Sequence, residues 1–316
     1  MVSVKSENIR IIEALNGRPV MITVGMFDGV HKGHRYFIRK MVEEAGKRKM
    51  IPVLISMYPH PRKIIAKKDF KCLTSLAEKE SHIRSLGIEH FIVLQTTREL
   101  LDKTASEFLT YLLENKLNIK AVAMGFNNRF GKMTSNEMPV DTIVEKMGMD
   151  FVRIPGFGEE VSSTSIREFL VRGAVESAAA LLDYPYALFG HVVEGNKLGR
   201  SLGFPTANIK VDSVDKLIPA VGVYAVTCTI NNMVYAGMMN IGYRPTVEEN
   251  GSDIYLEVHM PGERFDIYNQ YVKVEFFKKI RDEKRFDSLE ELRAQLAKDK
   301  DFIITYFHAN FVAPKK

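Results

Sequence analysis

The chain of 316 residues contains no tryptophan and only two cysteines, Cys72 and Cys228. The cysteines are far apart and form no Cys-x-x-Cys pair, so neither a disulfide framework nor a thiolate metal site is predicted. No apolar run is long enough to span a membrane, and the first residues lack the apolar core of a signal peptide. We therefore expect a protein of the reducing cytoplasm, with no membrane partner.

Positive charge is present but not concentrated. The formal net charge is +5 and the pI is near 8.9, yet no basic stretch is interleaved with aromatic residues. A mild excess of this kind suits polyphosphate substrates, and it gives no reason to expect a nucleic-acid partner. Because 316 residues exceed what one compact core usually organises, two domains are predicted.

The first half of the chain alternates short apolar runs with amphipathic helical patterns. Two of these helices begin with capping boxes, Ser75 with Glu78 and Thr104 with Glu107. Such alternation predicts an α/β domain with a doubly wound, Rossmann-like parallel sheet. The expected strands are residues 20–24, 51–57, 91–95, 120–124 and 150–154.

The pattern changes at residues 183–185, after which short strands rich in Val, Tyr and Thr dominate. Asn231 and Asn232 separate two of these strands and suit a two-residue hairpin turn, because Asn tolerates positive φ. Closely spaced antiparallel strands predict a small β-barrel, followed by a terminal helix capped by Ser288. The expected domains are therefore residues 1–183 and 184–316.

A strand, a glycine-rich turn and a helix carry the histidine motif GMFDGVHKGH. Gly25 and Gly29 are expected to let the backbone turn sharply and approach a ligand. His31 and His34 should lie on one edge of the helix start, where free N–H groups and the helix dipole favour an anion. Each imidazole can donate to a phosphate oxygen, whether neutral or protonated. Two merely exposed histidines are the simpler alternative, which the strand-turn-helix context disfavours.

Three further polar motifs follow other strands of the predicted sheet. They are YPHPRK with His60 and Arg62, GFNNRFGK with Asn127, and SSTSIREFL with Arg167. Because ligands bind beyond the carboxyl ends of parallel strands, these motifs predict one site together with the histidines. For SSTSIREFL, plain helix capping beside an exposed arginine is an alternative.

In the second half, the hexapeptide GFPTAN follows a glycine-flanked basic loop. Pro205 fixes the backbone, and Thr206 and Asn208 then present oxygens on one side of an extended chain. Such oxygens suit Mg²⁺ bound together with a nucleotide. By sequence alone, Glu257 in YLEVHM could equally be a strand residue that faces solvent.

Together these motifs carry a family resemblance. GMFDGVHKGH with SSTSIR resembles the HxGH nucleotidyltransferases, and YPHP, GFNNRFG and GFPTAN narrow this to bacterial bifunctional riboflavin kinase/FAD synthetases. The resemblance implies an N-terminal FMN adenylyltransferase and a C-terminal riboflavin kinase that use riboflavin, FMN and ATP and produce FAD.

The resemblance also implies roles for particular residues. In the adenylyltransferase, His31, His34 and Arg167 are catalytic, and the flavin lies near His60, Pro61, Arg62 and Asn127. Further ATP contacts in that domain come from Gly25, Phe27, Asp28, Gly29, Gly33, Ser163 and Thr164. In the kinase, Glu257 is the general base, Thr206 and Asn208 hold Mg²⁺, and ATP binds Gly195, Lys197, Gly199 and Arg200.

Some positions depart from the family pattern, among them Met26, Asn269 and residues 133–138. An active kinase with an inactive or differently selective first domain is therefore an alternative. A flavin-binding regulatory protein on a degenerate scaffold is another, which the intact motif residues disfavour. No oligomeric state is predicted.

Overall fold

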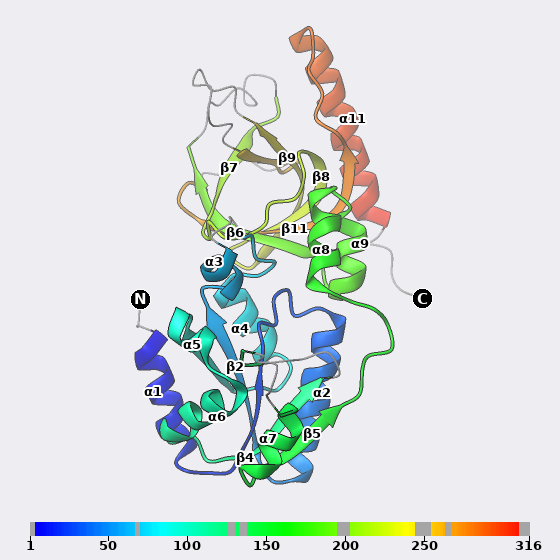
Figure 1. The fold of residues 1–316 in the computed structure, drawn as a ribbon. Helices are drawn as coiled ribbons and strands as arrows, with labels where there is room; N and C mark the ends of the chain where they lie inside the picture. The colour runs from blue at the N-terminus through cyan, green and yellow to red at the C-terminus, as the bar shows by residue number, and fades with distance from the viewer. Residues whose placement is uncertain are drawn as a thin grey trace. The chain divides into compact units, whose positions relative to one another are not determined.

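The computed structural model describes residues 4–66, 70–125, 130–132, 138–194, 203–243, 254–262 and 267–309 (Figure 1). The chain divides into two compact units, Met1–Ser163 and Thr164–Lys316. Helices α8 (Ser163–Val171) and α9 (Val175–Leu182), which the sequence analysis assigned to the first domain, thus fall almost wholly in the second unit. The proposed boundary between residues 183 and 184 stays a prediction.

The first unit contains a five-stranded parallel sheet in the order β3-β2-β1-β4-β5. Its strands lie within one or two residues of the predicted ranges: β1 (Val20–Val24), β2 (Ile51–Tyr58), β3 (His90–Gln95), β4 (Ile119–Gly125) and β5 (Asp150–Ile154). The chain runs from β1 outward to β3 and then returns to the other side of β1. The strand order therefore reverses between β1 and β4, the place where open α/β sheets bind ligands.

Helices cover both faces of this sheet, as the doubly wound prediction requires (Figure 1). They are α1 (Val4–Leu15), α2 (Lys32–Lys47), α3 (Pro61–Ala66), α4 (Leu76–Arg84), α5 (Arg98–Asp102), α6 (Ala105–Glu114) and α7 (Val140–Lys146). Both predicted capping boxes, at Ser75 and Thr104, are formed.

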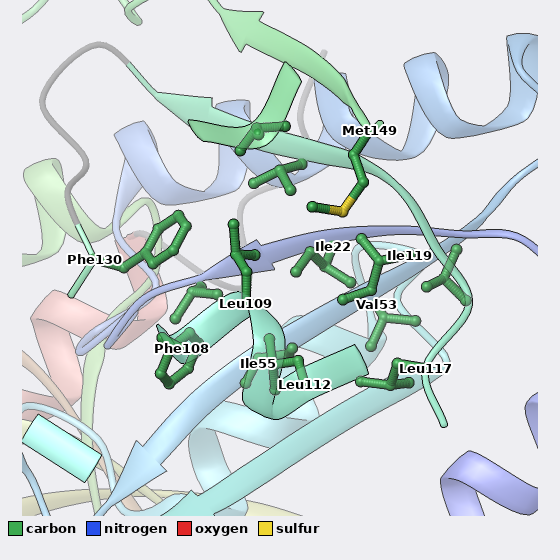
Figure 2. Packing of buried hydrophobic residues seen from close by; sticks show 14 of the residues in the cluster. Ile22, Val53, Ile55, Phe108, Leu109, Leu112, Leu117, Ile119, Phe130 and Met149 are labelled. Carbon is green, nitrogen blue, oxygen red and sulfur yellow. The ribbon is translucent and has the colours of Figure 1, made fainter. Parts of the chain in front are cut away.

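Strand β1 divides its apolar side chains between two cores. Ile22 packs with Phe108 and Leu112 of α6 on one face, as Figure 2 shows. Met21 packs with residues of α2 such as Ile38 on the opposite face. A strand that is apolar on both faces is thereby fully buried, which fixes the loop that follows it.

The second unit is built on a closed antiparallel barrel in the order β10-β7-β6-β11-β8-β9. Its elements are β6 (Tyr186–Val193), β7 (Thr206–Val211), β8 (Gly222–Ile230), β9 (Met233–Tyr243), β10 (Ile254–His259), β11 (Tyr271–Arg281) and the terminal helix α11 (Leu289–Phe307). The predicted hairpin turn is confirmed, with φ of 50° at Asn231 and 64° at Asn232.

Side chains of the barrel strands alternate between the inner and the outer face of the barrel. Leu188, Val226 and Val258 are buried on one face. Met238 of β9 lies on the other face and packs with Ile303 of α11, so the terminal helix covers part of the barrel's outer surface. Among the described residues, no helix is both long and apolar enough to cross a membrane.

Candidate active sites

The two histidines of the motif lie directly beyond β1. His31 is the N-cap of α2, and its Nδ1 accepts a hydrogen bond from the His34 backbone N–H at 3.4 Å. The two rings stack with their centroids 3.6 Å apart. The structure thus brings both imidazoles together at the free amino end of a helix, where backbone N–H groups favour an anion.

Both imidazoles are neutral at pH 7. Burial lowers the pKa of His31 to about 4, against the opposing charge of Asp28. Burial also lowers the pKa of His34 well below its usual value, with further contributions from His31 and Lys79. Since His31 Nδ1 accepts a hydrogen bond, the neutral ring carries its proton on Nε2 and donates from there. From the sequence, either protonation state of the imidazoles could donate to a phosphate oxygen. The lowered pKa values leave the neutral state as the donor at pH 7.

The turn between β1 and α2 depends on more than its glycines. Gly29 has φ of 81°, as expected, but Phe27 and Val30 also adopt positive φ, 48° and 35°. Gly25 does not have positive φ. A Cβ there would lie 2.8 Å from the Phe27 ring, whose centroid is 5.1 Å from that of His34. Gly25 therefore leaves room for the aromatic ring that supports His34.

The carboxylate of Asp28 is almost fully buried and connects two segments of the first unit. It accepts hydrogen bonds from the backbone N–H groups of Leu73 and Thr74 and from the Thr74 hydroxyl. The Asp28 carbonyl accepts from the Ser163 hydroxyl at 2.8 Å. Asp28 thus orders the loop between β1 and α2, a role that sequence reasoning did not assign; Thr74, too, was missed.

Two other predicted ATP contacts follow Ser163 on α8. Thr164 and Arg167 belong to the second unit, whereas Ser163 belongs to the first.

Gly33 lies in the first turn of α2, where a Cβ would be 3.4 Å from the His31 ring. A Cβ at this distance would make van der Waals contact with the imidazole.

The predicted flavin contacts at the end of β2 form a small aromatic and basic cluster. Helix α3 begins at Pro61, and His60 Nδ1 accepts from the Arg62 backbone N–H at 3.2 Å. The Phe70 ring lies 4.3 Å from the His60 ring, centroid to centroid, and 5.4 Å from the Arg62 guanidinium carbon. Sequence reasoning missed Phe70. Asn127 lies outside the described residues.

The neutral state of His31 can be tested by titration. Its ring proton resonances should titrate near pH 4, below the 6.5 of an unperturbed imidazole. The unfolded chain then binds this proton at higher pH than the folded one, so the first unit should lose stability as the pH falls from 6.5 towards 4. NMR with a His31→Asn spectrum for assignment measures this; titration of His31 at 6.5 would contradict the buried neutral imidazole.

The proposed kinase residues meet across three neighbouring barrel strands. Asn208 of β7 pairs directly with Glu257 of β10, which in turn pairs with Asn240 of β9. Thr206 pairs with His259 in the same register. Since directly paired residues share a face, these five side chains lie on one surface of the barrel, opposite the interior that holds Val258. Asn240 was not identified from the sequence.

His259 fixes the loop that leads into β7. Its Nδ1 donates to the Pro205 carbonyl oxygen at 2.8 Å, and its ring packs edge-on against Phe204, with centroids 5.3 Å apart. Burial lowers the pKa of His259. This hydrogen bond and this ring contact link the motif GFPTAN to the motif YLEVHM, which lies about 50 residues later in the sequence.

Gly195, Lys197, Gly199 and Arg200, predicted to bind ATP, lie outside the described residues. Within the described part of the chain, no group of three or more His, Cys, Asp or Glu residues is placed to hold a metal ion.

Comparison with known families matches both halves of the chain. The model of the FAD synthetase family matches residues 14–165, and that of the riboflavin kinase family matches residues 182–307. The histidine pair thus lies in the first matched region, and the Thr206, Asn208 and Glu257 surface lies in the second.

Relatives match along nearly the whole length. The chain is 35% identical over 309 residues to the bifunctional riboflavin kinase/FMN adenylyltransferase of Escherichia coli strain K12, covering 92% of this chain and 95% of the relative. It is 33% identical over 294 residues to the enzyme of the same name from Bacillus subtilis strain 168, covering 91% and 92%. A crystal structure described as a macrolide-efflux protein from Streptococcus pneumoniae is 30% identical, with a TM-score of 0.81 and coverage of 90% and 94%. With both families and full-length relatives in agreement, the chain belongs to the bifunctional riboflavin kinase/FMN adenylyltransferases.

Proposed function

We propose that this bifunctional enzyme of flavin cofactor biosynthesis uses two separate sets of residues, one for each reaction. The observation that carries the proposal is the gathering of Thr206, Asn208 and Glu257 on one surface of the barrel. The stacked pair of His31 and His34 in the other unit supports the second set. Riboflavin is phosphorylated by ATP to FMN, and FMN is then adenylylated by a second ATP.

In the kinase step, the terminal ribityl hydroxyl attacks the γ-phosphorus of ATP. Glu257 accepts the hydroxyl proton, the bond between the γ-phosphorus and its bridging oxygen breaks, and ADP leaves. Asn208 and Asn240 flank Glu257 on the adjacent strands, so the three side chains share this surface. Tyr255 accepts from the Asn240 amide at 3.0 Å, which in turn orients Asn240.

Mg²⁺ is proposed to accompany ATP in the kinase. The hydroxyl of Thr206 and the amide oxygen of Asn208 are oxygen donors two residues apart on β7, and they fit such an ion when phosphates and waters supply its other ligands. When bound, the ion neutralises charge on the phosphates. The protein's own contribution is to hold these donors in place beside Glu257.

In the adenylyltransferase step, a phosphate oxygen of FMN attacks the α-phosphorus of ATP and pyrophosphate leaves. No covalent enzyme intermediate is required, so the rate depends on positioning and on stabilising the transition-state charge. His31 and His34 are proposed to donate to phosphate oxygens, and the family resemblance adds Ser163, Thr164 and Arg167. His60, Arg62 and Phe70 are proposed to contact the flavin.

Incubation with riboflavin, ATP and Mg²⁺ tests the proposal. We expect FMN to appear first and FAD to follow, both separated by chromatography. Accumulation of FMN without FAD, even when FMN is supplied, would favour the alternative of an inactive or differently selective first domain. Absence of FMN would contradict the kinase assignment.

A reducing cytoplasm is the proposed location, with small molecules as partners and neither nucleic acid nor membrane. Among the described residues, Cys72 and Cys228 form no disulfide. Burial raises the pKa of Cys228 to about 12, which makes this thiol unreactive at neutral pH.

The division of the chain predicts that the kinase folds alone. A fragment of residues 164–316 should convert riboflavin to FMN and form no FAD, because it lacks His31 and His34. A fragment of residues 184–316 should melt about 5 °C or more lower. The shorter fragment lacks α9, whose Val175 and Leu182 are buried. It also lacks the Leu170 carbonyl, which accepts a hydrogen bond from the Ala220 N–H. Thermal melting and product analysis measure both; equal stability would place the boundary at residue 183.

A further inference from the structure

Lys79 is a buried lysine whose ammonium lacks a direct partner in the part of the chain that the structure describes. It lies on α4, and only 6% of its surface is exposed. Within the described residues, its ammonium makes no hydrogen bond and no ion pair. Lysines are almost never buried to this degree unless they are paired, because an unpaired charge in the protein interior is costly. A bound ligand with negative charge would compensate the charge of this ammonium.

The acidic neighbour of Lys79 is already occupied. The charge of Asp28 acts on Lys79 and favours its protonated form, but burial has the larger effect and lowers the Lys79 pKa. The Asp28 carboxylate accepts its hydrogen bonds from Leu73 and Thr74 instead. Asp28 thus keeps an anion near Lys79 without satisfying its three N–H donors.

Lys79 also acts on the histidine site. Its charge contributes to the low pKa of His34, so the ammonium lies within electrostatic range of that ring. His34 Nδ1 is buried and makes no hydrogen bond with any described residue. The loop that carries the histidines also meets the start of α4, because its Asp28 accepts hydrogen bonds from Leu73 and Thr74 just before that helix, so α4 and its Lys79 lie near the histidine pair in the first unit.

A polyphosphate needs such a cation. His31 and His34 are neutral at pH 7, so they offer hydrogen bonds but no positive charge. When pyrophosphate leaves ATP, negative charge builds up on the departing phosphates, and a nearby ammonium stabilises it. We propose that Lys79 is a third phosphate-binding group beside His31 and His34, contacting the phosphates that depart as pyrophosphate. This inference rests on the proposed adenylyltransferase role of the histidine pair.

The proposal predicts opposite effects on stability and on binding. Lys79→Met keeps the length of the side chain and removes a buried unpaired charge, so the melting temperature should stay the same or rise. The KM for ATP in FAD synthesis should rise about 10- to 100-fold, the size expected when a charged hydrogen bond is lost. Lys79→Arg should recover part of the loss, because it restores the charge.

The experiment uses the full-length chain. FAD synthesis from supplied FMN is measured at varied ATP for the parent, Lys79→Met and Lys79→Arg, and pyrophosphate binding is measured by calorimetry. Lys40→Met is the matched control, because Lys40 is exposed on α2 and pairs with Glu43. We expect weakened pyrophosphate binding in Lys79→Met alone, with riboflavin phosphorylation unchanged in every variant.

A parental KM for ATP and parental pyrophosphate binding in Lys79→Met would overturn the inference. Failure of this variant to fold, or a clear fall in its melting temperature, would also overturn it, since Lys79 would then be structural. The proposed function fails separately: in that case His31→Asn, too, would leave FAD synthesis intact. If His31→Asn abolishes FAD synthesis and Lys79→Met does not affect ATP use, only the role of Lys79 is rejected.

Discussion

Replacing His31 with asparagine should lower the rate of FAD synthesis from FMN by about 10²- to 10⁴-fold. The imidazole Nε2–H is the proposed donor to a phosphate oxygen, and asparagine removes it. Asparagine is also a favoured N-cap, so the start of α2 should keep its hydrogen bond to the His34 N–H. The loss should therefore reflect phosphate binding in the transition state and not unfolding of the helix. His34→Ala should give a loss of similar size.

The measurement is the steady-state rate of FAD formation with FMN and ATP supplied, beside the rate of riboflavin phosphorylation by the same preparation. Phosphorylation should remain normal, because Glu257 and its neighbours lie in the other unit. His90→Asn is the matched control, since His90 begins β3, at the amino-terminal edge of the sheet, away from the loop after β1. A FAD rate within a few-fold of the parent in His31→Asn would remove the histidine from the proposed site.

Replacing Glu257 with glutamine should lower kcat for riboflavin phosphorylation by about 10²-fold or more. Glutamine keeps the volume of the side chain and its place between Asn208 and Asn240, but it does not accept the hydroxyl proton. Binding of ATP with Mg²⁺ through Thr206 and Asn208 should persist, so KM for ATP should change little. The loss should thus fall on kcat.

FAD synthesis from supplied FMN should continue at its normal rate in Glu257→Gln, because His31 and His34 belong to the other unit. Glu275→Gln is the matched control on the same barrel, since Glu275 lies on β11 and pairs with Lys273. This control should phosphorylate riboflavin normally. Near-normal FMN production by Glu257→Gln would show that the proton is accepted elsewhere.

Signals confined to short segments of sequence predicted most of the fold. The apolar runs located all five strands of the first sheet, because a fully buried parallel strand must be apolar on both faces. The Ser75 and Thr104 capping boxes and the Asn231–Asn232 turn also formed as predicted, since each depends on residues only a few positions apart. Strand β7 was not among the predicted strands, although the extended chain at Thr206 and Asn208 was anticipated.

Short sequence patterns predicted the structure less well where the conformation depended on tertiary packing. Glycines were expected to supply the turn after β1, but besides Gly29 the non-glycine residues Phe27 and Val30 also adopt positive φ. The contacts of the Phe27 ring with His34 and Phe37 accompany this conformation, and the sequence does not reveal them. Helices α8 and α9 group with the barrel, because α9 packs on β6 and β11 and the Leu170 carbonyl of α8 accepts from the Ala220 N–H.

The sequence by itself determined the motifs of both halves of the chain and the alternation of strands and helices that builds the parallel sheet. It also determined which residue types are available for phosphate and Mg²⁺ chemistry. Only the tertiary structure decided that His31 and His34 are neutral, since a pKa depends on burial and on charges such as Lys79, 45 positions from His34. Likewise, only strand register placed Glu257 between Asn208 and Asn240. Burial and pairing are set by residues distant in the chain, so they follow from the packed fold and not from any short motif.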